Sequence, residues 1–492
     1  MALDANNMSG TVDEKRRESA DTPVLLDERA PGQSSPKVLK WIFSTLSKVV
    51  FTALGVTVAL LYLNKPPTLL SSPSSPRRYS THHFRSHCAN IPAITTSEFH
   101  LRQTKLSEAL SSNHLSAFIS EPGPSAQYFA NISSSSWYKS ERPLLLVVLS
   151  QPTETDRESD PLSPPKMLLL TPKFEASRAK QLAIPATAAQ KLEFVEWAED
   201  EDPYQVLYDK IFSLDTRNHR NRKIVIDDQT RLFVAQGLSR AGFQFGQEVP
   251  EDVARLRERK SDAELNILRC INEVTLLVIR DVRERLYLGM KESDASALME
   301  YALTGAGLAE QGVFAKAQFG DHAALPHGGP TDKTLSKHDM ITFDVGGSLR
   351  GYWSDVTRTF ALPTSQIPSG HLQIWKTVQD AQMAALTMAR EGVMAEDVDA
   401  AARLVISKSG YGERFTHRLG HGIGLEMHES PYLRGGYKKE IEIGNTFSNE
   451  PGIYIEGKVG VRLEDCMFID KSGQAVLLTA GVGGAARSPW MP

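Results

Sequence analysis

The sequence of 492 residues has only three cysteines, Cys88, Cys270 and Cys466. Three are too few for the disulfide framework of a small secreted domain. They share no CxxC or Cys-His spacing, which excludes a structural zinc finger. An excess of basic residues is also lacking, because the formal net charge is −4 and the pI is near 6.4. A dedicated nucleic-acid-binding protein would carry a basic face, so we expect no nucleic-acid partner.

Apolar residues are plentiful enough to form large cores. They make up 41% of the chain and charged residues 23%, which excludes a mainly disordered protein. Residues 1–40 are the exception: they are polar, show no apolar period and are expected to be a disordered tail. Residues 64–91 are rich in Pro and Ser and are predicted to be a linker.

A run of 23 mostly apolar residues, 41–63, separates the tail from the linker. It is long enough to cross a bilayer, with Trp41 and Tyr62 where interfacial aromatics would lie. A buried core helix would usually show a polar face, and a cleaved signal peptide would have a shorter preceding segment and a small-x-small site. The run therefore predicts a single-pass signal anchor.

The orientation of this anchor is poorly determined by the sequence, since the flanking basic residues are nearly equal in number. A short tail before a first hydrophobic segment often stays cytosolic. We therefore expect a type II protein whose part after residue 63 is lumenal or extracellular. Asn131-Ile132-Ser133 is a glycosylation sequon that can report on this.

The remainder of the chain divides into two predicted domains. Between 92 and 255, helical spacing alternates with short apolar runs at 144–150, 166–172 and 223–228, which predicts an α/β domain. Residues 256–492 open with a long helical pattern at Ser261, where Glu264 completes a predicted capping box. Strand-like runs, Gly-rich turns and further helices follow, so we expect an α+β second domain.

Two aspartates in a predicted β-hairpin, residues 340–360, give the first chemical signal. Asp344 and Asp355 lie in the two arms, where an isolated Asp is disfavoured and two facing carboxylates would repel each other. A divalent cation between them would relieve that repulsion. The alternative is that both are edge or turn residues paired with Arg350 or Arg358.

Two later segments add histidines and carboxylates. His417, His421 and His428 lie within a Gly-rich stretch that cannot be a zincin helix. Glu450 ends the apparent strand 446–450. Arg462 and Glu464 lie two residues apart and so share one face of a strand. If that face is buried, Glu464 needs a partner such as a metal, and Arg462 needs a substrate carboxylate or another acid. The alternative is that the two pair with each other on a solvated face.

These motifs together resemble the pita-bread metallopeptidases, in the branch of Xaa-Pro aminopeptidases and prolidases. The matching stretches are ALPHGGPTDKTL, FDVGG…GYWSDVTRTF, HRLGHGIGLEMHESPY, NEPGIYI and GVRLED. The resemblance covers about 256–492 strongly and 92–255 more weakly. It implies a C-terminal pita-bread domain behind a smaller creatinase-like α/β domain, together an α+β protein. Cys466 replaces an acid that many relatives carry, but this position is not a ligand in the family.

The resemblance also implies roles for named residues. The implied ligands of two divalent ions, usually Mn²⁺ and sometimes Co²⁺ or Zn²⁺, are Asp344, Asp355, His421, Glu450 and Glu464. Asp355 and Glu464 would bridge the ions, and Glu450 would also shuttle a proton for an attacking metal-bridging water. The positions that match substrate-contacting or other active-site residues are His327, His428, His417 and Arg462.

The expected activity is hydrolysis of the bond between an N-terminal residue and proline, in peptides or dipeptides. Whether the enzyme is an aminopeptidase or a dipeptidase stays open, and a homodimer is compatible with the family. A methionine-aminopeptidase-like enzyme shares the five ligands but not the large N-terminal domain. A non-catalytic binding module of the same fold, or a metal-free hydrolase of the creatinase type, would lack part of the ligand set.

Overall fold

The computed structural model describes residues 79–150, 165–185, 192–214, 223–246 and 248–492. The predicted tail, the predicted anchor at 41–63 and residues 64–78 of the predicted linker lie outside these ranges. Within the described residues, no helix is both long and apolar enough to cross a bilayer.

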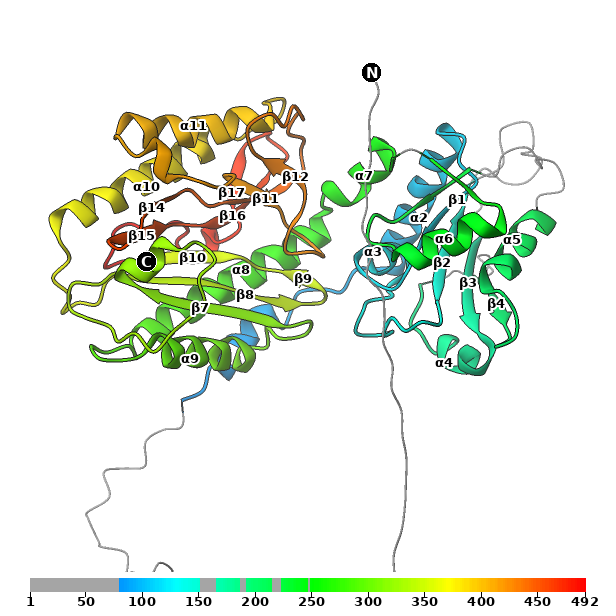
Figure 1. The fold of residues 1–492 in the computed structure, drawn as a ribbon, viewed down its shortest axis with the longest axis horizontal. Coiled ribbons are helices and arrows are strands. Elements are labelled where there is room, and N and C mark those ends of the chain that lie inside the picture. Colours follow the sequence, from blue (N-terminus) through cyan, green and yellow to red (C-terminus); the bar gives the residue numbers. More distant parts are fainter. Residues whose placement is uncertain (1–78, 151–164, 186–191, 215–222, 247) are drawn as a thin grey trace, which may run out of the picture. The chain divides into compact units, whose positions relative to one another are not determined.

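The N-terminal part is a mixed six-stranded sheet flanked by helices, as the alternation of patterns predicted (Figure 1). The strand order is β4-β3-β2-β1-β5-β6. The strands are β1 (Ala117–Ser120), β2 (Leu145–Leu149), β3 (Met167–Pro172), β4 (Leu192–Trp197), β5 (Lys223–Ile226) and β6 (Gln244–Phe245). The helices are α2 (Thr96–Ser112), α3 (Pro124–Ala130), η3 (Lys173–Glu175), α4 (Ala176–Ala179), α5 (Pro203–Leu214) and α6 (Leu232–Ala241).

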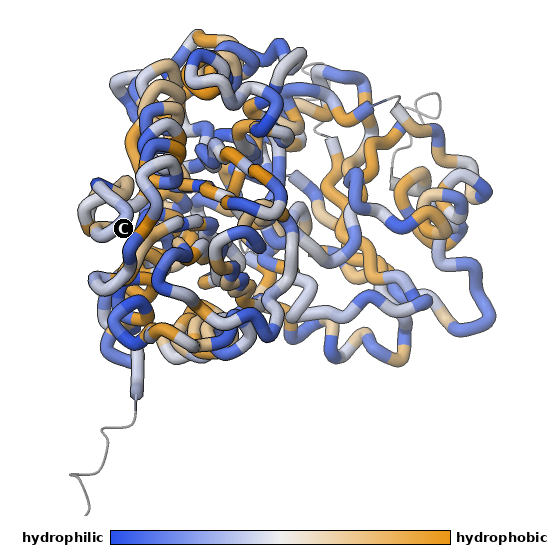
Figure 2. Tube along the Cα trace, turned by 60° about the vertical axis from the view of Figure 1, so that its left-hand side comes forward, coloured by the Kyte–Doolittle hydropathy of each residue, from blue (hydrophilic) through white to orange (hydrophobic). Residues whose placement is uncertain are grey.

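The central strands of this sheet are apolar on both faces. In β2, Leu146 and Val148 pack into one core, whereas Leu145 and Val147 pack into a second core on the opposite face. A strand that is covered on both sides reads as a continuous apolar run rather than an alternation. Figure 2 accordingly shows apolar colour along the strands and more hydrophilic colour along the outer loops.

The C-terminal part begins with three helices, α7 (Glu251–Glu258), α8 (Asp262–Arg283) and α9 (Glu292–Gly305). The strands and short helices that follow are β7 (Val313–Phe319), η4 (Gly320–Ala324), β8 (Ile341–Leu349), β9 (Tyr352–Trp353) and β10 (Val356–Phe360). After α10 (Ser369–Met388), α11 (Ala395–Lys408) and η5 (Gly412–Arg414) come β11 (Gly420–Gly422), β12 (Glu429–Leu433), β13 (Thr446–Asn449), β14 (Gly452–Ile455), β15 (Val459–Arg462), β16 (Asp465–Ile469), β17 (Ala475–Leu477) and η6 (Ala480–Val482).

Antiparallel pairing organises these strands. β8 lies between β7 and β10, and separate pairs join β11 to β12, β14 to β15 and β13 to β16. Helices α8 and α9 pack on β8 and β7, and α10 packs on β15, so that the strands lie between two helical layers (Figure 1). The predicted capping box at the start of α8 is confirmed, since Ser261 and Glu264 exchange hydrogen bonds.

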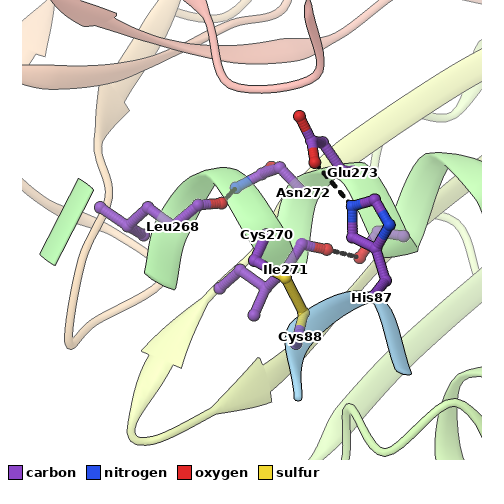
Figure 3. Close-up of a disulfide and its surroundings, with 8 residues drawn as sticks. His87, Cys88, Leu268, Cys270, Ile271, Asn272 and Glu273 are labelled. Carbon is purple, nitrogen blue, oxygen red and sulfur yellow. Dashed lines mark hydrogen bonds and ion pairs between the residues drawn. A yellow bond between two sulfur atoms is a disulfide. The ribbon is translucent and has the colours of Figure 1, made fainter. Parts of the chain in front are cut away.

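A disulfide bond joins Cys88 to Cys270 (Figure 3). Cys88 ends the short helix η1 (His82–Cys88), and Cys270 lies 182 residues later in α8. Beside the disulfide, the His87 imidazole lies 2.6 Å from the Glu273 carboxylate. The sequence excluded a framework of disulfides but did not predict this single bond, because nothing local relates two cysteines so far apart.

The segment around Cys88 is held along its length. The Thr81 hydroxyl is fully buried and donates to the carbonyl of Ala302 at 2.6 Å, and Arg85 donates to the carbonyl of Gly305 at 2.9 Å. Residues 79–91, at the end of the predicted linker, are therefore attached to both α8 and α9.

We expect the disulfide to stabilise the fold by closing a long loop in the unfolded chain. Replacing both Cys88 and Cys270 by Ser should lower the free energy of unfolding by roughly 2–4 kcal/mol. Thermal melts with and without dithiothreitol measure this. Reductant should lower the melting temperature of the wild type and leave that of the double variant unchanged, and equal melting of the wild type in both conditions would contradict the expectation.

Candidate metal centre and active site

The five residues predicted to bind metal come from five separate places in the C-terminal strands. Asp344 lies in the middle of β8, and Asp355 directly precedes β10. His421 is central in β11, and Glu450 follows the last residue of β13. Glu464 lies between β15 and β16, where it forms a bridge with Thr357 of β10.

The fold brings the five side chains together. Their ligand atoms form overlapping groups, within each of which all atoms lie within 4.8 Å of one another. One group holds Asp344, Asp355 and Glu464, and another holds His421, Glu450 and Glu464. A third joins Asp355 and His421 to His428, which the family resemblance places at the substrate instead.

The orientation of His421 leaves one ring nitrogen aimed at the carboxylates. Its Nδ1 donates to the carbonyl of Gly422 at 3.0 Å, so in the neutral ring Nε2 carries a lone pair. Burial lowers the pKa of His421, which therefore stays neutral. Its Nε2 lies 3.3 Å from Glu450 and 3.7 Å from Asp355. Lone pairs facing one another at these distances require a cation or a proton between them.

Two of the carboxylates also have oxygens without a partner. Asp355 Oδ1 and Glu464 Oε1 are buried and have no hydrogen-bond partner among the described residues. Burial and the charges of Glu464 and Asp344 raise the pKa of Asp355 well above its usual range. Burial also raises the pKa of Glu450 to about 7, and burial with the Glu450 charge raises that of Glu464 to about 8.

This donor set fits divalent cations. Four carboxylates and one imidazole offer hard, mainly oxygen ligands, as Mn²⁺ and similar ions prefer. Asp355, His421 and Glu464 each belong to two of the three ligand groups, so the groups form one connected cluster. The five residues that would hold these ions are Asp344, Asp355, His421, Glu450 and Glu464.

The neighbouring polar groups fix the ligands in place. Thr357 donates its hydroxyl to Glu464 at 2.6 Å, and Ser448 donates to Glu450 at 3.1 Å. Arg358 is fully buried; it donates to the carbonyl of Glu464 at 2.6 Å and pairs with Asp465 at 2.7 Å. Arg358 therefore supports the Glu464 backbone and does not pair with Asp344 or Asp355, as the alternative interpretation of the hairpin required.

Arg462 is a buried cation beside the carboxylates. It pairs with Asp344 at 2.7 Å rather than with Glu464, so these two residues do not form the solvated pair that was the alternative. It also donates to the Tyr454 hydroxyl at 3.2 Å. The Tyr454 hydroxyl in turn lies 2.8 Å from His417 Nε2, whose Nδ1 donates to the carbonyl of Arg418. Arg462, Tyr454 and His417 thus form one hydrogen-bonded chain.

The remaining predicted histidines lie near this chain. His327 is exposed in the turn after η4, and Arg462 donates to the carbonyl of the preceding Pro326 at 3.4 Å. Gly460 in β15 permits η4 to pack this closely, because a Cβ there would meet the Ala323 carbonyl at 1.8 Å. His428 is also exposed, and its ring meets that of His421 with centroids 4.2 Å apart.

Both His417 and His428 are neutral in this setting. Partial desolvation lowers the pKa of each to about 4, helped at His417 by the charge of Arg462. Neutral imidazoles can donate one proton and accept another, as a site for acid–base chemistry needs.

Comparison with known proteins decides the family. Residues 266–471 match the model of metallopeptidase family M24. An uncharacterized peptidase of Schizosaccharomyces pombe is 41% identical over 81% of this chain and 84% of its own length. The chain belongs to metallopeptidase family M24. Its C-terminal domain is the pita-bread fold of that family, and the predicted recognition is confirmed.

Two other similar M24 proteins have more specific names. The Xaa-Pro dipeptidase of Lactobacillus delbrueckii subsp. lactis is 34% identical over 57% of this chain and 76% of its own length. The crystal structure of a dipeptidase from Pyrococcus horikoshii superposes with a TM-score of 0.64 at 29% identity, covering 77% of this chain and 97% of the archaeal one. The similarity thus includes the N-terminal α/β domain as well as the M24 domain.

The sequence analysis missed several residues of the site. Tyr454, Thr357 and Ser448 carry the hydrogen bonds that join the predicted residues, yet no charge or unusual spacing marked them. Tyr454 did have a signal. Gly452 is the strand partner of Arg462, and Tyr454 lies two residues later, so its side chain is on the same face of the strand. Thr and Ser in strands are too common for a comparable inference.

The protonation of the carboxylates predicts how metal-free protein responds to pH. Because Glu450 and Glu464 have raised pKa values near 7 and 8, the folded state binds protons that the unfolded chain releases near 4.5. Their contribution to stability is therefore lost as pH rises towards 8. His417 and His428 act oppositely, but only up to about 6.5. Between pH 6.5 and 8 the melting temperature of EDTA-treated protein should fall.

Added Mn²⁺ should reverse this trend, since it displaces protons from the carboxylates. The rise in melting temperature on adding Mn²⁺ should be larger at pH 8 than at pH 6.5, as measured by differential scanning fluorimetry. The control is Glu464→Gln, which should flatten the pH dependence of the metal-free form. A Mn²⁺ effect of equal size at both pH values would count against the assignment.

Proposed function

We propose that this protein is a dimetal-dependent exopeptidase that hydrolyses the bond between an N-terminal residue and proline, with dipeptides as its main substrates. The observation that carries the proposal is the complete set of five ligands, gathered around buried carboxylate oxygens that have no other partner. A non-catalytic module would have no need to retain all five. The Xaa-Pro dipeptidase and the dipeptidase among its relatives support the choice of substrate.

The proposed function assigns a role in metal binding, proton transfer or substrate contact to each predicted site residue below. The five ligands would hold divalent ions, which would supply Lewis-acid chemistry for a carbonyl and for an attacking water. Glu450, one oxygen of which accepts a hydrogen bond from Ser448, is the carboxylate that takes up and releases the proton in this proposal. His327 and His428 are both exposed, and in this proposal their imidazoles donate hydrogen bonds to the substrate.

Turnover of small peptides tests this activity. Purified protein with Mn²⁺ should release proline from Gly-Pro or Ala-Pro, and should cleave Ala-Pro-Ala more slowly, with free amino acids measured by chromatography. Faster cleavage of the tripeptide would identify an aminopeptidase instead. Cleavage of Met-Ala-Ser without any cleavage of Xaa-Pro bonds would favour the methionine-aminopeptidase alternative.

Matched variants show whether the metal ligands perform the reaction. Glu464→Gln should lose nearly all turnover, because it removes one of the five charged or imidazole ligands, and Glu456→Gln on the neighbouring exposed turn is the control. If Glu464→Gln, or EDTA-treated wild type, retained full activity, the proposed chemistry would be wrong.

We also propose that residues 41–63 anchor the protein in a membrane as a type II protein, with the peptidase domain lumenal or extracellular. Two features of the described residues support this. Disulfides persist in oxidising compartments, and this domain has one between Cys88 and Cys270. Asn131 of the sequon is exposed at the end of α3, in a turn where an oligosaccharide can be attached.

Glycosylation reports the orientation. Membrane fractions should show a glycosidase-sensitive gel shift that Asn131→Gln removes. The tail contains a second sequon, Asn7-Met8-Ser9, on the other side of the hydrophobic run, so Asn7→Gln is the matched control and should not alter the shift. A shift that depends on Asn7 would show the opposite orientation. Extraction of the protein by alkaline carbonate would show that residues 41–63 do not anchor it in the membrane.

A further inference from the structure

The turn that carries His428 is fastened from outside the metal centre. This turn, residues 423–428, joins β11 to β12, and His428 is its last residue. Among the described residues, no side-chain hydrogen bond holds the His428 ring itself. Its position therefore depends on the backbone on either side, where Glu429 follows directly.

Glu429 is a buried carboxylate held by two cations. Lys260 Nζ lies 2.5 Å from one of its oxygens, and Arg257 Nη2 lies 3.0 Å from the other. Burial opposes ionisation, but the charges of Lys260 and Arg257 outweigh it and lower the pKa of Glu429. The second oxygen also accepts from the backbone N–H of Glu426, so the carboxylate closes the turn upon itself.

The two cations come from the junction between the domains. Arg257 lies in α7, and Lys260 lies between α7 and α8. Arg257 also binds Glu426 at 2.6 Å and donates to Ser125 of α3 at 3.1 Å. Gln229, also in the N-terminal domain, donates to Glu426. These contacts tie the N-terminal domain, the junction and the His428 turn together.

The packing at this point is tight. The Lys260 side chain is only 1% exposed. A Cβ on Gly424 would lie 2.5 Å from Glu429 Oε1 and 2.9 Å from Lys260 Cε. The ion pair thus occupies the space that a side chain at residue 424 would need, and the turn has little freedom to move relative to it.

We propose that Glu429, clamped by Arg257 and Lys260, is a positioning residue that holds His428 against the reacting substrate. This rests on the proposed function of His428 at that site. None of the clamp residues is among the five predicted metal ligands, so loosening the clamp should leave metal binding intact. A buried charge that loses its partner is costly, and for that reason the mildest substitutions are the most informative.

A double-mutant cycle tests the coupling to His428. With Mn²⁺-loaded full-length protein and Ala-Pro as substrate, Glu429→Gln should lower kcat roughly 10- to 100-fold, the range for residues that orient active-site groups. KM and metal content should change little. In a His428→Ala background the same substitution should have almost no further effect on kcat, because it acts through the missing ring. If Glu429→Gln lowers kcat by the same factor with and without His428, Glu429 has a general structural role and the proposal is overturned.

Arg257 offers a matched comparison on the same helix. Arg257→Gln should reproduce the loss of kcat, and Arg257→Lys should restore part of it. Arg255→Gln removes an exposed, ion-paired arginine two residues away and should leave kcat unchanged. Equal losses in Arg257→Gln and Arg255→Gln would contradict the clamp.

Hydrogen exchange separates the clamp from the proposed activity. In the Mn²⁺-loaded protein, amides of residues 423–429 should exchange faster in Arg257→Gln and Glu429→Gln than in the wild type or Arg255→Gln. If Xaa-Pro substrates are not cleaved but exchange increases as expected, the clamp stands and the proposed function fails. Unchanged exchange in both clamp variants would overturn the clamp itself.

Discussion

Mutual repulsion among four buried carboxyl groups is the constraint to which the surrounding structure responds. Two unit charges about 4 Å apart still repel by roughly 4 kcal/mol at an effective dielectric constant of 20. Arg462 offsets the charge of Asp344, and Thr357 and Ser448 each satisfy one oxygen. Two buried oxygens, one of Asp355 and one of Glu464, have no hydrogen-bond partner among the described residues. These unpaired, negatively charged oxygens make the site suitable for cations.

Antiparallel strands hold the repelling groups in place. Each ligand comes from a strand or from the residue next to one, and a strand fixes where its side chains point. Behind them, Arg358 and Asp465 form a fully buried ion pair that secures the chain on either side of Glu464. From the other side, Thr275 of α8 contacts Ser354 at 2.7 Å, directly before Asp355. The chain next to Glu464 and Asp355 is therefore held by contacts within the core.

Much of this could be predicted from the sequence, and the remainder could not for identifiable reasons. Apolar runs and caps predicted the strands at 145–149 and 167–172 and the start of α8, because their signals are local. The convergence of Asp344, His421 and Glu464 followed from a family resemblance, since spacing alone says nothing about distant strands. The Cys88–Cys270 bond and the Glu429 clamp were missed because their partners are 182 and about 170 residues apart.

The long-range contacts that the sequence concealed share one location, the region where α7 and α8 begin the C-terminal domain. The disulfide attaches the segment before the N-terminal domain to α8, and Arg257 and Lys260 attach the junction between the two domains to the His428 turn. Helix α8 in turn reaches Ser354 beside Asp355. Contacts from outside the matched M24 segment thus reach the turn that carries His428. An N-terminal domain that supplies none of the predicted site residues can in this way still influence the position of groups at the site.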